Sequence, residues 1–183
     1  ETGAKLTNFC VGCNWGAIKK SSFFGMMSST VDVDLDLSCL MFDADGNPVD
    51  HIWSPLYRLK DLPKGKLDSN DRALHHTGDD LQGDQDGDDG LDNEIITVDL
   101  NRVSSNIQSI VFFLNIYNND DYKGDFSGIP YAHIRMFEGK PTEAPRQVFA
   151  QYDVSTKTDC VGMRGLIMGK LYRRNGDWRF AAI

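Results

Sequence analysis

Acidic residues gather in one short segment of this 183-residue chain. Eight carboxylates and no basic residue lie between Asp79 and Glu94, and the other 19 acidic residues balance the 19 lysines and arginines. This segment therefore carries the whole formal net charge of −8. It would repel phosphates, which argues against nucleic acid as a partner of the acidic face. A cation is its natural partner.

Glycines interrupt the carboxylates through residues 78–90, where they let the backbone turn its carbonyls inward. Calcium takes about six to eight oxygen ligands, and a loop of this density can supply most of them. Magnesium fits less well, because it prefers few protein ligands and keeps bound water. The alternative is a disordered, solvated acidic run. Disorder is disfavoured because the strand-like segment 95–100 follows at once and would hold the end of the loop.

The spacing of Asp84, Asp86 and Asp88 resembles the start of an EF-hand loop. However, Asp89 stands where that loop requires glycine, and Ile95 stands where it requires a bidentate glutamate. The flanking segments also have the pattern of strands rather than helices. We therefore do not expect an EF-hand.

A second acidic group lies in residues 31–37, where valine or leucine alternates with aspartate. In a strand, alternate side chains point to opposite faces, so Asp32, Asp34 and Asp36 would share one face about 6.5–7 Å apart. Such a row is either a solvated polar face or a set of carboxylates that needs a cation. Because the acidic loop supplies further oxygens, we expect Asp34 and Asp36 to form the other half of a cation site.

Other residues that could do chemistry have structural interpretations. No nucleophilic triad, G-x-S-x-G or P-loop pattern occurs, so we expect no catalytic residues. His75 and His76 adjoin the acidic loop, but imidazole suits softer metals, so we expect them to make structural hydrogen bonds. Cys10 and Cys13 form C-x-x-C without a second pair at zinc-ligand spacing. Together with Cys39, they are interpreted as buried thiols in a reducing cytoplasm.

Apolar and β-branched runs of strand length alternate with turn residues along the chain. This pattern predicts an all-β fold, a two-sheet β-sandwich with short helical segments in the connections near 103–106 and 155–162. Hairpin turns are expected at 43–48 and at Asn175-Gly176, the latter of type I′. The predicted strands are 9–14, 30–42, 49–53, 94–100, 107–117, 131–137, 147–153, 166–173 and 178–182.

We expect residues 1–183 to form one domain, because this length suffices for a single core. No segment approaches about 20 apolar residues, and the start lacks the apolar core of a secretory signal, so a soluble protein is predicted. Residues 1–3 resemble a cloning remnant, and the sequence leaves open whether native residues precede Ala4. The basic, aromatic ending at 170–179 is typical of the outer face of a terminal hairpin, and the alternative is contact with a partner or phospholipid.

Three separated segments resemble the TerD family of bacterial tellurite-resistance and stress proteins. They are 34–38 (DLDLS), 76–89 (from HTGDD to GDD) and 169–182 (GKLYRRNGDWRFAA). Segments 11–16 and 129–131 fit the TerZ-like branch of the family. The chain departs from the family where Asp80 replaces a frequent asparagine, where Gly90 replaces a frequent acid, and where an additional N-terminal strand segment is not found.

The resemblance implies a β-sandwich that binds calcium through the acidic strand and the acidic loop. We expect two Ca²⁺ ions in a non-enzymatic module of the tellurite-resistance and general stress-response system. It would act as a scaffold or regulator through other proteins of that system, in the cytoplasm or peripherally at the inner membrane face, without a small-molecule substrate. The predicted metal ligands are Asp34, Asp36, Asp79, Asp80, Asp84, Asp86, Asp88, Asp89 and Glu94.

Two alternative functions stay open. A metal-dependent phosphoester hydrolase also uses clustered aspartates. Such an enzyme would need a cationic group to hold the phosphate, and none lies in the loop. A calcium-dependent lipid-binding module resembling a C2 domain also joins acidic loops to a sandwich.

Overall fold

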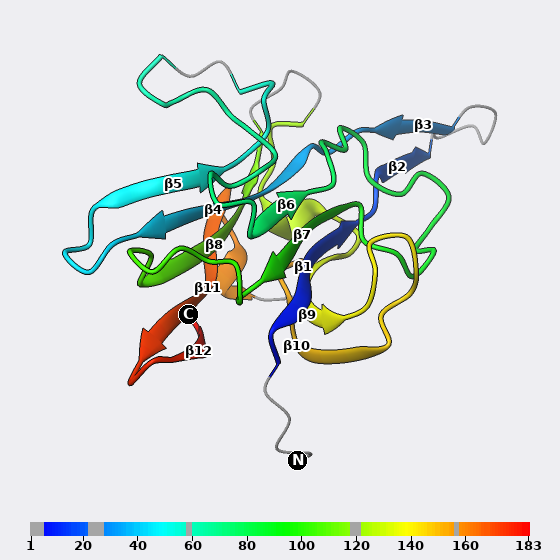
Figure 1. Cartoon of the computed structure of the whole chain (residues 1–183). Coiled ribbons are helices and arrows are strands. Elements are labelled where there is room, and N and C mark those ends of the chain that lie inside the picture. Colours follow the sequence, from blue (N-terminus) through cyan, green and yellow to red (C-terminus); the bar gives the residue numbers. More distant parts are fainter. Residues whose placement is uncertain (1–5, 22–27, 58–59, 118–121, 156–157) are drawn as a thin grey trace.

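Antiparallel strands pair into two five-stranded sheets and a projecting hairpin (Figure 1). The structure is a computed structural model and describes residues 6–21, 28–57, 60–117, 122–155 and 158–183. The sheet that we call the β1 sheet has the order β10 (Gln147–Asp153), β9 (Ala132–Glu138), β1 (Asn8–Trp15), β7 (Glu94–Asp99) and β6 (Leu74–His76). The β8 sheet has the order β12 (Asp177–Ala182), β11 (Gly165–Arg174), β8 (Ser109–Ile116), β4 (Leu35–Phe42) and β5 (Pro48–Ile52).

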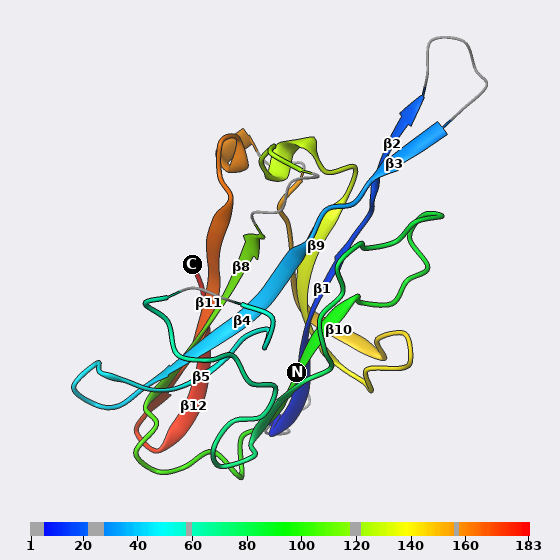
Figure 2. The same cartoon turned by 90° about the horizontal axis from the view of Figure 1, so that it is seen from above.

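The two sheets form the predicted sandwich, which confirms the all-β fold class (Figure 2). β1 leads into β2 (Ile18–Ser21), and β3 (Ser28–Val31) leads into β4, so the projecting β2–β3 hairpin carries the chain from one sheet to the other. The connections contain two single helical turns, η1 (Phe126–Gly128) and η2 (Thr158–Cys160). Neither of these helices in the described part of the chain is long or apolar enough to cross a membrane.

The core lies between the sheets because apolar residues alternate along the central strands. Along β8 every second residue is buried, namely Ile110, Phe112, Leu114 and Ile116. The inward-facing residues of β4 are fully buried, namely Leu35, Leu37, Cys39 and Met41. Complete burial of one such side chain stabilises the fold by about 1.5–3 kcal/mol, so this alternation decides which face each strand turns inward.

The prediction of one continuous strand over 30–42 is wrong. Residues 32–34 lie between β3 and β4 and belong to neither strand. Here the carbonyl of Val33 accepts the indole N–H of Trp15 (2.7 Å), and the carbonyl of Asp34 accepts the N–H of Tyr117 (2.8 Å). The chain leaves the hairpin at this point and joins the edge of β8. Asp34 therefore lies just before β4 and Asp36 is the second residue of β4, rather than both lying within one long strand.

The other differences concern short elements. The strands β2 and β6 were not predicted, because four and three residues carry too little periodicity to be recognised. Segment 103–106 forms turns rather than a helix. Within 155–162 the only described helical element is η2, and residues 156 and 157 lie outside the described part. Both hairpin turns are confirmed, and φ values of 55° at Asn175 and 82° at Gly176 agree with type I′.

Candidate metal centre

Carboxylates converge at two places in the described part of the chain. The first, here called the buried cluster, consists of Asp34, Asp36 and Asp79. The second, here called the loop cluster, consists of Asp84, Asp88 and Asp89. Within each cluster, one oxygen of every residue lies within 4.8 Å of the others. The acidic segment thus contributes to both groups, and β4 contributes to the first.

The buried cluster is positioned by the pairing of β4 with β8. Asp36 lies opposite Asn115 in this pairing, and the amide of Asn115 donates to Asp36 Oδ2 (3.2 Å). The same amide donates to the hydroxyl of Tyr57 (2.9 Å). Asp34 and Asp36 are only 6% and 2% exposed, so both acidic side chains are withdrawn from water. Asp79 reaches them from the loop that follows β6.

Two oxygens of this cluster are buried and have no hydrogen-bond partner, namely Oδ1 of Asp34 and Oδ1 of Asp79. A buried acceptor without a donor costs about 1–3 kcal/mol, and more when it is charged. Nearly all buried polar groups in folded proteins avoid this cost. Two such oxygens in one cluster therefore fit a cation, which would supply the missing partner. The donor set is oxygen only, which suits a hard cation such as calcium.

The electrostatic environment of the buried cluster also favours a bound cation. Burial, and then the charge of nearby Asp79, raises the pKa of Asp34 to about 7. Burial raises the pKa of Asp36 to about 9, with Asp34 adding to the effect and a hydrogen bond from Tyr57 opposing it. The described residues that line this site include no lysine, arginine or histidine. The negative charge must therefore be balanced by protons or by an external cation.

Glu94 joins the two acidic segments from the beginning of β7. It is fully buried, and its oxygens accept the N–H groups of Leu37 (2.8 Å) and Asp80 (3.0 Å). His76 supports the same junction. Gly78 donates its N–H to His76 Nδ1 (3.0 Å), so the proton on Nε2 is directed to the Leu37 carbonyl (3.0 Å). The prediction of structural hydrogen bonding by His76 is confirmed.

The start of the acidic loop is held against β1. The Asp84 N–H donates to the Trp15 carbonyl (2.9 Å), and the Ala17 N–H donates to the Asp84 carbonyl (3.0 Å). Gly83 precedes this contact with φ 68°, and a Cβ there would lie 2.3 Å from the indole nitrogen of Trp15. Only glycine allows the loop to approach the tryptophan so closely. Asp80 closes the preceding turn, because its Oδ1 accepts the N–H of Gly83 (3.0 Å).

The loop cluster is more exposed than the buried cluster. Asp84 accepts the hydroxyl of Tyr131 at Oδ2 (2.8 Å), and Asp88 accepts the amide of Asn14 at Oδ1 (3.1 Å). Asn14 is itself fully buried, and its Oδ1 has no partner. Asp88 and Asp89 are exposed, so solvent already stabilises part of their charge.

The end of the loop is anchored by an ion pair that sequence reasoning missed. Arg135 of β9 donates from Nε to both oxygens of Asp92 (2.9 and 3.0 Å) and from Nη2 to the Gly90 carbonyl (2.8 Å). The Asp92 side chain is only 1% exposed. Burial raises its pKa to about 6, against the lowering effect of Arg135. Asp92 is acidic like its neighbours, and nothing in the local pattern distinguishes it from a metal ligand.

The nine predicted ligands thus fall into three groups. Six lie in the two clusters. Asp80 and Glu94 accept backbone N–H groups, and Asp86 is exposed and lies outside both clusters. The participation of all nine in metal binding stays a prediction. Asn115 and Arg135 were missed, because only strand pairing brings them to the acidic residues. Tyr57 was missed as well, because it lies in a loop and reaches the cluster through its contact with Asn115.

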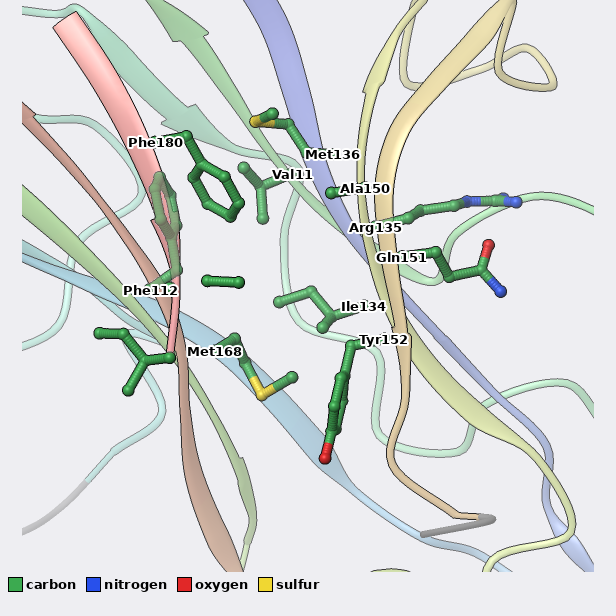
Figure 3. A pocket seen from close by; sticks show the side chains of 13 residues that line it. Val11, Phe112, Ile134, Arg135, Met136, Ala150, Gln151, Tyr152, Met168 and Phe180 are labelled. Carbon is green, nitrogen blue, oxygen red and sulfur yellow. The ribbon is translucent and has the colours of Figure 1, made fainter.

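Three cavities help to locate a ligand site. One of about 400 Å³ opens beside the buried cluster. A second, of about 100 Å³, lies between the sheets, where Val11, Ile134 and Phe180 face it while Arg135 and Gln151 point away (Figure 3). It is an apolar packing gap. A third, of about 880 Å³, lies at the other end of β1, where arginines are balanced by acidic residues. Among the described residues that line these three cavities, the buried, unpartnered carboxylate oxygens of Asp34 and Asp79 border the first.

Comparison with known proteins places these features in context. The sequence profile of the "TerD domain" family matches residues 1–183. "Tellurium resistance protein TerZ" of Serratia marcescens is 28% identical over 184 residues, which cover 100% of this chain and 82% of the relative. "Stress response protein SCP2" of Bacillus subtilis (strain 168) is 31% identical over 183 residues, which cover 98% of this chain and 83% of the relative.

Solved structures resemble the fold. The crystal structure of a homologue of telluride resistance protein (TerD), SCO6318 from Streptomyces coelicolor A3(2), has a TM-score of 0.66 at 18% identity and covers 97% of this chain and 88% of its own. The crystal structure of the unknown-function protein SAV2460 has a TM-score of 0.68 at 20% identity, with coverage of 98% and 89%. At these identities, the comparison with solved structures supports the sandwich fold alone.

Proposed function

The chain belongs to the TerD domain family, and we propose that it is a calcium-binding, non-enzymatic module of a bacterial tellurite-resistance and stress-response system. It acts through protein partners, as a scaffold or regulator whose surface depends on bound calcium. Relatives named for tellurium resistance and stress response support the biological setting. The chemistry of the buried cluster supports the ion.

The observation that carries the proposal is the pair of buried, unpartnered oxygens on Asp34 and Asp79. A cation held between them removes the cost of both and neutralises Asp36 as well. The clusters in the described residues contain carboxylates only, which favours calcium over zinc. The cysteines do not compete for this role, because all four are buried and lie outside both clusters. The loop cluster, with the buried amide oxygen of Asn14 nearby, is the candidate for a second ion.

A binding role is favoured over hydrolysis of phosphoesters. Two-metal hydrolases hold their ions about 3.5–4 Å apart and stabilise the phosphate charge. Here Arg135, the arginine beside the acidic loop, is already committed to Asp92 and Gly90. The contacts of Glu94 link the buried cluster to the loop, so an ordered ion would also order the surface that the loop presents.

Calorimetry tests the proposal directly. Calcium added to protein freed of metal with EGTA is expected to bind saturably, with magnesium at least about tenfold weaker. The Asp34→Asn plus Asp36→Asn variant is expected to lose calcium at the buried cluster. The matched control, Asp45→Asn plus Asp61→Asn, changes the charge equally at two exposed positions and should bind calcium like the parent.

Two further measurements separate this function from its rivals. Metal-dependent turnover of bis(4-nitrophenyl) phosphate would favour the hydrolase. Calcium-dependent sedimentation with phosphatidylglycerol vesicles would favour the lipid-binding module. We expect neither. Absence of calcium binding to the parent protein would refute the proposal itself.

A further inference from the structure

The cavity beside the buried cluster is larger than a metal ion requires. Its volume is about 400 Å³, whereas one water molecule occupies about 30 Å³ in the liquid. Carboxylates of Asp34, Asp36 and Asp79 lie on its wall. The other described residues that line it are Asp32, Ser54, Leu56, Tyr57, Leu81, Gln82 and Tyr117. The site is therefore open to a molecule much larger than a cation.

Much of this wall is apolar or aromatic. Leu56 and Leu81 are 53% and 49% exposed. The rings of Tyr57 and Tyr117 stack with their centroids 5.6 Å apart and their planes at 12°. A single exposed leucine needs no explanation. Two that border the same cavity, beside a stacked aromatic pair, form a surface that suits an apolar ligand.

The ligand count leaves room for an external oxygen. Calcium takes about six to eight oxygens, and the buried cluster supplies three carboxylates. Oδ2 of Asp36 already accepts the amide of Asn115. Other oxygens must complete the coordination, and the cavity is the open space from which they can come. An anion cannot approach the three carboxylates alone, because like charges repel, so the metal must be present first.

We propose that this cavity binds a small organic anion whose carboxylate or phosphate oxygen completes the coordination of calcium at the buried cluster. The apolar body of the anion packs against Leu56, Leu81 and the stacked pair Tyr57 and Tyr117. This inference rests on the calcium-binding function proposed above and names the class of ligand for that site. Calcium binding and ligand binding are then coupled, since each strengthens the other.

Methyl NMR of the calcium-loaded protein provides the test, with benzoate and phenyl phosphate as probes. Both combine an anionic group with an aromatic body, and their comparison distinguishes a carboxylate from a phosphate ligand. We expect saturable shifts of the Leu56 and Leu81 methyl resonances with at least one of them. Acetate has the charge without the body, and benzyl alcohol has the body without the charge. Each should bind at least tenfold more weakly.

Two double variants distinguish the contribution of the apolar wall to probe binding from the contribution of the metal. Leu56→Ser plus Leu81→Ser is expected to weaken binding of the preferred probe at least tenfold, while calorimetry shows unchanged calcium affinity. Leu62→Ser plus Val49→Ser alters two exposed apolar residues outside this cavity and serves as the matched control. It should bind calcium and the probe like the parent.

The outcomes distinguish this inference from the function on which it rests. Calcium binding without binding of either probe would overturn the inference alone. Equal probe affinity in EGTA and in calcium would overturn the role of the metal as a bridge. A wall variant with undiminished probe affinity would overturn the apolar subsite. Absence of calcium binding would refute both proposals.

Discussion

The carboxylate of Asp92 shows how strongly one residue can depend on another that is distant in the sequence. It is buried between Gly12 and Arg135, and a Cβ at position 12 would lie 2.3 Å from its Oδ2. Arg135 supplies both the charge and the donors that make this burial tolerable. Through Gly90 the same guanidinium holds the backbone of the acidic loop. Asp92 is therefore an anchor, whereas the clustered aspartates are candidates for metal binding.

Removal of this guanidinium should destabilise the fold. Arg135→Met leaves a buried, unpaired carboxylate, and we expect a loss of about 3–5 kcal/mol in the free energy of unfolding. Urea denaturation measures it. Arg146→Met is the control, because its exposed ion pair with Glu138 (3.7 Å) should be worth less than about 1 kcal/mol. Addition of Asp92→Asn to Arg135→Met should restore part of the loss, and equal losses for the two arginine variants would contradict this account.

The raised pKa values of Asp34 and Asp36 predict how the stability of the metal-free protein depends on pH. Burial raises the pKa values of Asp34 and Asp36 from 3.8 to about 7 and about 9. Between these values and 3.8 the folded protein holds protons that the unfolded chain has released, so stability falls as pH rises. With EGTA, the melting temperature should therefore decrease from pH 5 to pH 9.

Saturating calcium should remove most of this decline, because the ion replaces the protons. The Asp34→Asn plus Asp36→Asn variant is the control, since it lacks both titrating groups and should lose the steep dependence in EGTA. A melting temperature of the parent protein that rises over the same range in EGTA would contradict the assignment.

At the scale of elements, the acidic loop is attached to the sandwich along its length. Asp84 pairs with the residue after β1 and contacts Tyr131, Asp88 contacts Asn14, and Asp92 is held by β9. These contacts are all made between residues of the chain itself, and they hold the two clusters against the sandwich. Preorganisation of this kind reduces the entropy cost of binding.

One of these attachments brings Gly83 directly against the indole of Trp15. Gly83→Ala places a Cβ against the indole, and we expect a cost of about 1–3 kcal/mol from overpacking in addition to about 1–2 kcal/mol for the left-handed backbone. Gly46→Ala is the matched control, because φ is 79° there and no atom lies within 4 Å of the added Cβ. Urea denaturation of both variants measures the difference. Equal losses would show that the indole contact contributes nothing.

At the scale of the whole molecule, charge is divided unevenly. The formal net charge of −8 resides in the acidic segment, while the rest of the chain is balanced. Two calcium ions would cancel half of it. Calcium should therefore act on global stability as well as on the loop, because it relieves the repulsion among carboxylates that folding brings together.

The linkage between calcium binding and folding predicts how much calcium should raise the free energy of unfolding. At free calcium one hundred times the measured Kd, one site should raise the free energy of unfolding by about 2.7 kcal/mol relative to EGTA. Urea denaturation at several calcium concentrations checks the expected logarithmic dependence. Magnesium at the same concentration should stabilise less. An equal gain with magnesium would contradict the selectivity for calcium, and no gain with either ion would contradict binding to the folded state.

Properties that depend on local pattern could be predicted from the amino-acid sequence alone. Apolar and β-branched runs bounded by turn residues predicted the central strands β1, β4, β7 and β8 and hence the sandwich. Turn chemistry predicted both hairpins. The concentration of carboxylates in one segment identified the candidate cation site, and three motifs identified the family.

Which acidic residues meet depends on how the strands pair in the folded chain. The register of β4 against β8 buries Asp36 beside Asn115, and the pairing of β1 with β9 places Arg135 over the loop end. Such pairings join segments that are far apart in the chain, and no local periodicity encodes them. The split of the predicted strand 30–42 has the same cause, since Trp15 and Tyr117 bind the backbone at 33 and 34. The sequence therefore showed where the carboxylates lie along the chain. The pairing of the strands determined which of them are buried candidate ligands, which, like Asp92, hold the loop in place, and which are exposed to solvent.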